Sequence, residues 1–132
     1  MGSVPRTIVL AARGVRRRVT LCEGGEVRLS WDNWSVGMGR GEFVDFAGVL
    51  AEAADRSMRC GETVRGCCGM VARCSMGQIQ VSHGSLGLWF SPEEFDELQR
   101  LTAGARGRLA DAEPPPALGI PWTPRVGPIS EN

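Results

Sequence analysis

Residues 26–43 read EVRLSWDNWSVGMGRGEF, and residues 78–95, which lie 52 positions later, read QIQVSHGSLGLWFSPEEF. Apolar residues alternate with polar ones at the start of both stretches, and both stretches end in Glu-Phe. The match extends outward without a gap, so that residues 6–56 align with residues 58–108 and 11 of the 51 aligned pairs are identical. An ungapped match of this length is typical of a tandem duplication of one supersecondary unit.

Each copy has the pattern of four short strands followed by one helix. In the first copy, Asp32 and Asn33 interrupt the alternation, and both residue types tolerate the backbone of a tight turn. The second copy has a comparable turn at residues 83–85. Period-two alternation on both sides of such a turn predicts a hairpin. The strands predicted for the first copy are residues 6–12, 17–21, 26–31 and 34–38.

A helix is predicted at the end of each copy. In the second copy, Ser91 can cap the helix, Pro92 suits its first turn, and Glu94 completes a capping box. The first copy has a looser start at Gly39, and its helix is predicted over residues 41–56. The predicted apolar stripes are Phe43, Phe46, Ala47, Leu50 and Ala54 in the first copy, and Phe95, Leu98, Leu101, Thr102 and Ala105 in the second.

These patterns predict an α+β fold, a tandem ββββα duplication with pseudo-twofold symmetry. We expect two antiparallel sheets, each covered on one face by the helix of its own copy. Because about 50 residues bury little surface alone, residues 1–110 are expected to form a single compact domain from both copies. Proline is frequent beyond residue 113, so residues 111–132 are predicted to form an extended tail in which Trp122 is the candidate anchor.

Composition narrows the class of protein. The 15 basic residues balance the 15 acidic ones, which argues against a dedicated nucleic-acid binder. No stretch is apolar enough to span a membrane, and no export signal is recognisable. We therefore expect a cytoplasmic protein that does not bind membranes, with free thiols among its five cysteines. No motif for a cofactor or for catalysis is present, so the sequence predicts no cofactor and no enzyme.

Three features are candidate binding elements. A dense positive patch lies in the first predicted hairpin, where it is either a solvated turn or a contact for an anion, a nucleic acid or an acidic partner; its residues are Arg13, Arg16, Arg17 and Arg18. Arg40 is at the predicted start of a helix, where anions bind. Trp89 alternates with Leu88 and Phe90, which places it on the sheet face away from the helix. This face is either a binding surface or the face where the two sheets meet.

The second copy is rich in cysteine. The spacing of these residues differs from that of a zinc knuckle, so buried structural thiols are the simpler interpretation and no metal is predicted. Metal or redox chemistry is one alternative, and its candidate residues are Cys60, Cys67, Cys68, Cys74 and His83. A disulfide is the other alternative.

The tandem ββββα order, with the helix last, resembles the PUR-repeat and Whirly group over residues 6–108. This resemblance implies binding of single-stranded nucleic acid on the sheets, and it assigns no individual residue. Residues 77–95 are also similar to small bacterial proteins, a similarity that implies no activity. We therefore expect a small non-enzymatic binding or assembly protein with a protein partner or a second copy of itself. A single-stranded nucleic-acid binder is the alternative, and a thiol-based metal or redox protein is the third interpretation.

Overall fold

The computed structural model describes residues 7–56, 58–74 and 76–112. The first copy comprises β1 (Thr7–Arg13), β2 (Arg17–Cys22), the short 3₁₀ helix η1 (Glu23–Gly25), β3 (Val27–Trp31), β4 (Trp34–Met38) and α1 (Arg40–Arg56). The second copy comprises β5 (Thr63–Arg65), β6 (Gly69–Arg73), β7 (Ile79–His83), β8 (Leu86–Phe90) and α2 (Pro92–Leu109). Both copies form a four-stranded antiparallel sheet with strands in sequence order, followed by a helix. The predicted α+β class and the duplicated ββββα order are confirmed.

The sequence also made predictions about a C-terminal tail and about membrane-spanning segments. Most of the predicted tail, including Trp122, lies outside the described residues. Among the described residues, no helix has the length and apolar character needed to cross a membrane.

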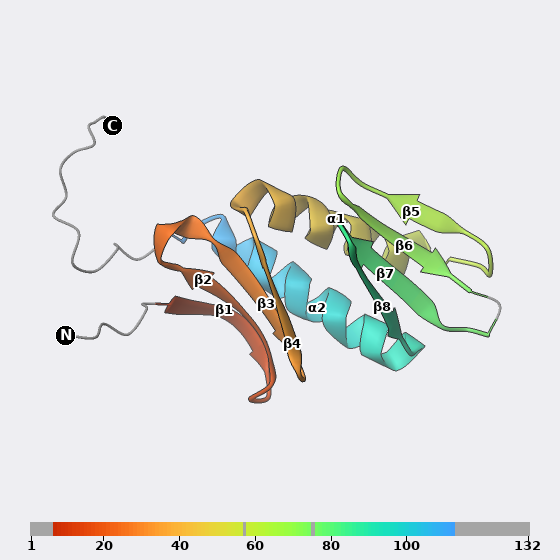
Figure 1. The fold of residues 1–132 in the computed structure, drawn as a ribbon, viewed down its shortest axis with the longest axis horizontal. Coiled ribbons are helices and arrows are strands. Elements are labelled where there is room, and N and C mark those ends of the chain that lie inside the picture. Colours follow the sequence, from red (N-terminus) through yellow and green to blue (C-terminus); the bar gives the residue numbers. More distant parts are fainter. Residues whose placement is uncertain (1–6, 57, 75, 113–132) are drawn as a thin grey trace, which may run out of the picture.

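The two helices are exchanged between the sheets. α1 makes its main sheet contacts with β5 and β6 of the second copy, and α2 makes its own with β1 and β2 of the first copy. Figure 1 shows the two sheets towards opposite ends of the long axis, with both helices running across the molecule between them. The expectation that each helix covers the sheet of its own copy is therefore wrong. Since each helix follows an edge strand, it can cross to the other sheet without a long connection, and the two helices then pack against each other.

One hydrophobic core is built from both copies. The rings of Trp31 on β3 and Phe90 on β8 meet edge to face, with their centroids 5.6 Å apart. Phe43 and Phe95 are both buried, as their equivalent positions in the repeat predict. The predicted stripe of α1 needs one correction, because Ala53 is buried and Ala54 is exposed. The helix continues its buried face three residues after Leu50 rather than four, and both spacings are compatible with a period of 3.6.

Two aligned turn positions have the same unusual backbone conformation, with a positive φ angle, in both copies. Gly25 and Gly77, which are aligned, have φ angles of 96° and 82°. Side chains other than glycine rarely adopt this backbone conformation, so the same residue is required in both copies. Asp32 and Gly84 are also aligned, with φ angles of 53° and 59°, and aspartate is one of the few residues that tolerate such an angle.

The first hairpins of the two copies differ in register by one residue. Val19 pairs with Ala11, whereas the aligned Val71 pairs with Val64 rather than with residue 63. β1 carries an irregularity between Val9 and Ala11 and extends along β2, whereas β5 has only three residues. A slip of one residue changes which side chains face the core. The first strands of the two copies are therefore not equivalent, although the sequence alignment contains no gap.

Candidate binding surface

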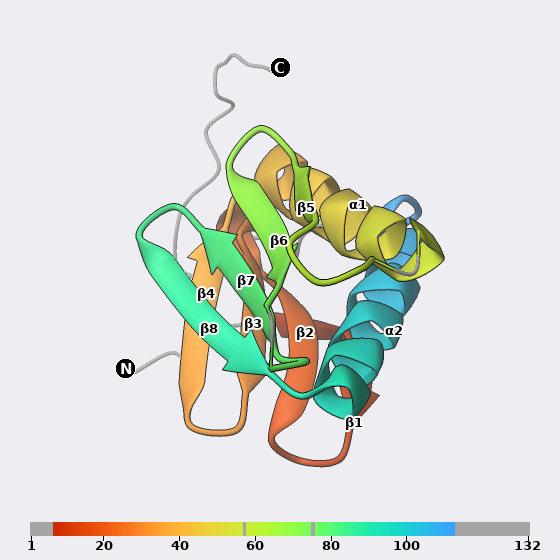
Figure 2. The same ribbon diagram turned by 90° about the vertical axis from the view of Figure 1, so that its right-hand side faces the viewer.

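The outer face of the second sheet is a continuous surface that neither helix covers. Side chains alternate along a strand, so the residues between the buried ones on β5 to β8 point away from the core. Figure 2 turns this end of the molecule towards the viewer and shows β7 and β8 free of either helix. We call this surface the Trp89 face; cross-strand pairing assigns to it Thr63, Arg65, Met70, Ala72, Gln80, Ser82, Gly87 and Trp89.

Trp89 is the main feature of this face. Its side chain belongs to an edge strand and the residue is 53% exposed, although tryptophan is mostly buried in folded proteins. It pairs across the sheet with Gln80. A Cβ placed on Gly87 would lie 3.9 Å from Gln80 Nε2 and 4.0 Å from Ser82 Oγ. The indole therefore lies beside an open position flanked by an amide and a hydroxyl group, and the face carries no carboxylate.

The outer face of the first sheet has different chemistry. We call it the Arg28 face; its residues are Val9, Ala12, Arg18, Thr20, Arg28, Ser30, Ser35 and Gly37. Gly37 is aligned with Trp89, and a Cβ at Gly37 would overlap the carboxylate of Glu26. That carboxylate forms an ion pair with Arg28, 3.0 Å away. An ion pair therefore covers the position where the second copy exposes an indole ring.

Two arginines of the predicted positive patch take part in a structural network. The Arg17 guanidinium donates to both carboxylate oxygens of Asp32, at 2.8 and 3.0 Å, and to Glu97 on α2 at 2.6 Å. It also lies 4.1 Å from the centroid of the Trp31 ring, a cation–π distance. Arg13 forms a second ion pair with Glu97 at 3.3 Å. These contacts join the first sheet to the helix of the second copy.

This network also changes the acidity of its members. The hydrogen bond to Asp32 is the largest of the effects that raise the pKa of Arg17, although partial burial opposes them. The hydrogen bond from Arg17 holds the pKa of Asp32 below its ordinary range, and the charges of Arg17 and Arg16 add to this effect. Asp32 is therefore ionised throughout the neutral range, and Arg17 is already engaged by two carboxylates.

The remaining predicted arginines are at separate places. Arg16 is exposed in the turn between β1 and β2, and Arg18 donates to the carbonyl oxygen of Val15 at 2.9 Å. Arg40 lies at the start of α1, as predicted, but its side chain donates to the carbonyl oxygens of Leu109 and Ala112, the latter at 3.1 Å. A cation at that position stabilises the negative end of α2. The backbone of Arg40 is therefore at the N-terminus of α1, as predicted, whereas its guanidinium is bound to carbonyl oxygens at the C-terminus of α2.

The cysteines of the second copy separate into two groups. Cys67 and Cys68 occupy the turn between β5 and β6, with their Sγ atoms 3.3 Å apart. Cys60 and Cys74 flank the opposite end of that hairpin, where the amide of Gly61 donates to the carbonyl of Arg73 at 2.8 Å. Cys67 raises the pKa of Cys68, first through their hydrogen bond and then through charge repulsion. The expectation of buried thiols is wrong for Cys67, Cys68 and Cys60, which are exposed, because turn residues lie outside the core.

His83 belongs to the packing between α1 and the second sheet. Its ring meets Phe46 edge to face at 5.4 Å, and its Nε2 lies 3.6 Å from Glu42. Its Nδ1 is buried without a hydrogen-bond partner among the described residues. Within residues 7–56, 58–74 and 76–112, no group of three histidine, cysteine or acidic side chains is arranged to hold a metal ion.

Sequence reasoning identified Trp89 but missed the acidic partners of the arginines. Glu97 is 80 residues from Arg17, and no local pattern connects them. The exchange of the helices brings them together. Comparisons with known protein families, with curated proteins and with solved structures give no match to this chain. The class of protein that the fold defines is a duplicated ββββα protein with two uncovered sheet faces.

Proposed function

We propose that this chain is a non-enzymatic binding or assembly protein, and that the Trp89 face is its contact surface for a protein partner or for a second copy of the chain. The observation that carries the proposal is the 53% exposure of Trp89 on a sheet face that neither helix covers. Tryptophan is the residue most enriched among those that dominate the free energy of protein interfaces. Met70 and Ala72, both half-buried, add apolar area on the same face.

The charge of the chain also supports a protein partner. The formal net charge is zero, so there is little long-range attraction towards a polyanion. Arg13 and Arg17, which sequence analysis offered as phosphate contacts, are paired with Glu97 and Asp32. An interface with a Trp anchor and few charges needs no such attraction.

The test compares the unchanged protein with Trp89→Ala. For each, we would identify the proteins that copurify with it and measure its self-association. We expect Trp89→Ala to lose the partner or to prevent self-association measured by analytical ultracentrifugation. Val44→Ala is the matched control, because Val44 is an exposed apolar residue on α1, 43% exposed. Equal association of all three proteins would contradict the proposal.

Single-stranded nucleic acid is the second candidate ligand, favoured by one observation. Trp89 and Arg65 share a face without a carboxylate, which combines a stacking ring with a phosphate contact. For an oligothymidine titrated at about 50 mM salt, Trp89→Ala should weaken binding by about 1–3 kcal/mol. Arg65→Gln should reduce the salt slope by about 0.7. If the unchanged protein does not bind the oligonucleotide, this candidate is eliminated and the protein-partner proposal is unaffected.

A further inference from the structure

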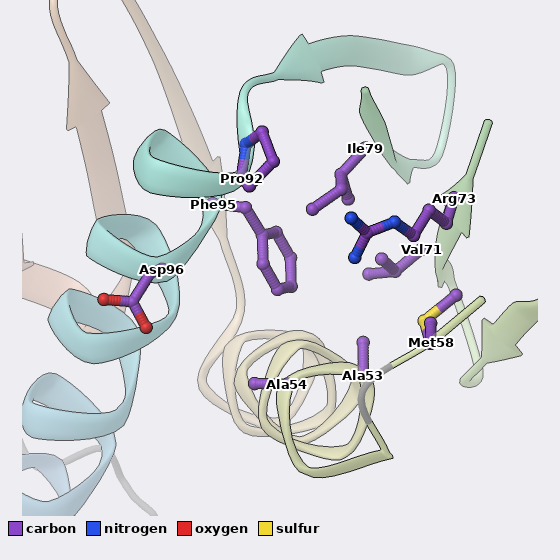
Figure 3. A pocket seen from close by; sticks show the side chains of 9 residues that line it. All are labelled: Ala53, Ala54, Met58, Val71, Arg73, Ile79, Pro92, Phe95 and Asp96. Atoms are coloured by element: carbon purple, nitrogen blue, oxygen red, sulfur yellow. The ribbon is translucent and has the colours of Figure 1, made fainter. Parts of the chain in front are cut away.

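A pocket opens on the inner side of the second sheet, on the opposite side of β6 and β7 from the Trp89 face. It has a volume of about 270 Å³ and lies between the end of α1, the start of α2 and these two strands. Most of the lining residues are apolar, among them Ala53, Met58, Val71, Ile79 and Phe95, and the charged side chains of Arg73 and Asp96 complete the lining (Figure 3). The pocket therefore offers apolar contacts together with polar ones.

One cation is directed into this pocket. Figure 3 shows the side chain of Arg73 extending from β6 into the pocket, with its guanidinium towards Phe95. Among the described residues, the Arg73 guanidinium has neither a hydrogen-bond acceptor nor an ion-pair partner. Asp96 on the opposite wall does not neutralise it, because Asp96 binds Arg100 at 2.8 Å. A half-buried cation without a partner favours an anion, since pairing offsets its desolvation.

Comparison of aligned residues indicates that this pocket belongs to the second copy and has no equivalent at the same place in the first copy. The residue aligned with Arg73 is Leu21, which is fully buried. The residue aligned with Pro92 is Arg40, whose side chain is used to bind the end of α2. Leu10 of β1 is also buried, whereas its counterpart Glu62 precedes the short strand β5. Divergence between the copies has therefore left a cation and free volume where the first copy has a closed core.

We propose that this Arg73 pocket binds a small amphiphile, an apolar chain with one anionic head group that pairs with Arg73. At about 30 Å³ for each water-sized group, the volume of about 270 Å³ accommodates roughly nine non-hydrogen atoms. Heptanoate, with a carboxylate on a short alkyl chain, has this size. The apolar walls bind the chain, and the guanidinium donates two hydrogen bonds to the carboxylate.

The experiment is a titration of the full-length protein with sodium heptanoate, followed by the amide shifts in ¹H–¹⁵N NMR spectra. We expect saturable shifts that centre on β6, β7 and the start of α2. We expect heptan-1-ol and heptylammonium to bind at least about tenfold more weakly, as loss of a charge-assisted hydrogen bond requires. Heptyl phosphate is the second probe; tighter binding of either anion supports the proposal and identifies the head group.

Variants test the two parts of the pocket separately. Arg73→Gln should weaken heptanoate about tenfold or more, and Arg73→Lys should retain part of the affinity because it keeps the charge. Arg56→Gln is the matched control, an exposed arginine near the end of α1 that pairs with Glu52. Ala54→Leu should block the pocket from an exposed helix position that tolerates a larger side chain, and Asp55→Leu is its control.

Three results would overturn the proposal. The first is heptanoate binding that does not saturate by about 10 mM. The second is equal affinity for heptanoate and heptan-1-ol, and the third is an unchanged affinity in Arg73→Gln. Because the pocket and the Trp89 face lie on opposite sides of the sheet, none of these results bears on the proposed function.

Discussion

The Trp89 face and the Arg28 face occupy equivalent sheets and have opposite surface chemistry. In the first copy, the Glu26–Arg28 ion pair lies over Gly37, so the face is charged and closed at that position. In the second copy, the aligned residue is the exposed Trp89, which pairs across the sheet with Gln80. Strand order and many core positions are shared, such as Val19 with Val71 and Phe43 with Phe95, whereas the outward position of Trp89 has diverged. The two copies therefore keep the same sheet architecture while presenting different side chains at an equivalent surface position.

The largest expected effect concerns what the copies share. Phe43→Ala and Phe95→Ala should each reduce the free energy of unfolding by about 3–5 kcal/mol, because each removes a buried ring from the common core. Urea denaturation measures this directly. Val44→Ala, an exposed neighbour on α1, should change it by less than about 0.5 kcal/mol. A loss below about 1 kcal/mol for only one of the two phenylalanines would mean that the copies do not share the core equally.

The two helix starts provide a second comparison. The hydroxyl of Ser91 accepts a hydrogen bond from the amide of Glu94 at 3.1 Å, and the Glu94 carboxylate accepts one from the Ser91 amide at 3.0 Å. At the start of α1 only half of this arrangement exists, where Glu42 accepts from the amide of Gly39 at 2.9 Å.

Ser91→Ala should therefore reduce the free energy of unfolding by about 1 kcal/mol, and Gly39→Ser should increase it by a few tenths. Thermal and urea unfolding of both variants check this, with Ser85→Ala in an exposed turn as the control. A decrease in stability for Gly39→Ser would show that α1 does not begin in the same way as α2.

The aligned turn residues Asp32 and Gly84 differ in charge. The pH dependence of the free energy of unfolding tests what this charge contributes. Arg17 lowers the pKa of Asp32 in the folded state, so this carboxylate stabilises the fold above its unfolded pKa. That contribution is lost as the pH falls below the ordinary value of 3.8 and through the lowered folded pKa. Asp32→Asn keeps a residue that tolerates the turn and removes the charge.

We expect the stability difference between the unchanged protein and Asp32→Asn to be full at neutral pH and to decline towards pH 2. Asp55→Asn on the exposed side of α1 is the control. A difference that stays constant across this range would mean that the Arg17–Asp32 pair does not contribute as an ion pair.

The last variant introduces the tryptophan of the Trp89 face at the equivalent position of the Arg28 face, and it should have little effect on stability. Gly37→Trp with Arg28→Gln should change the free energy of unfolding by no more than about 0.5 kcal/mol, because only the flexible ends of surface side chains must move. The double variant should gain a second contact surface, measured as increased partner stoichiometry or affinity. Unchanged binding would show that Trp89 acts only together with features found solely in the second copy.

Much of the fold was readable from the sequence because local patterns determine it. Alternation along residues 26–31 and 34–38, the glycines at 25 and 77, and the Ser91–Glu94 capping box depend on neighbours within a few residues. Because the chain is a duplication, the same pattern occurs in both copies, and each copy supports the prediction made for the other. Trp89 was also recognisable, because its phase relative to Leu88 and Phe90 sets the face on which it lies.

Only the tertiary structure decided which elements meet. The sequence contains no signal that α1 covers β5 and β6 or that α2 covers β1 and β2, because either arrangement buries the same apolar stripes. The exchange of the helices brings Glu97 close to Arg17 and Arg13. Both arginines, which the sequence offered as candidate contacts for a ligand, therefore form ion pairs within the protein. It also leaves Arg73 facing a pocket instead of a partner. Sequence patterns of period 2 and 3.6 set which side of an element is buried, and packing between distant elements sets what that side is buried against.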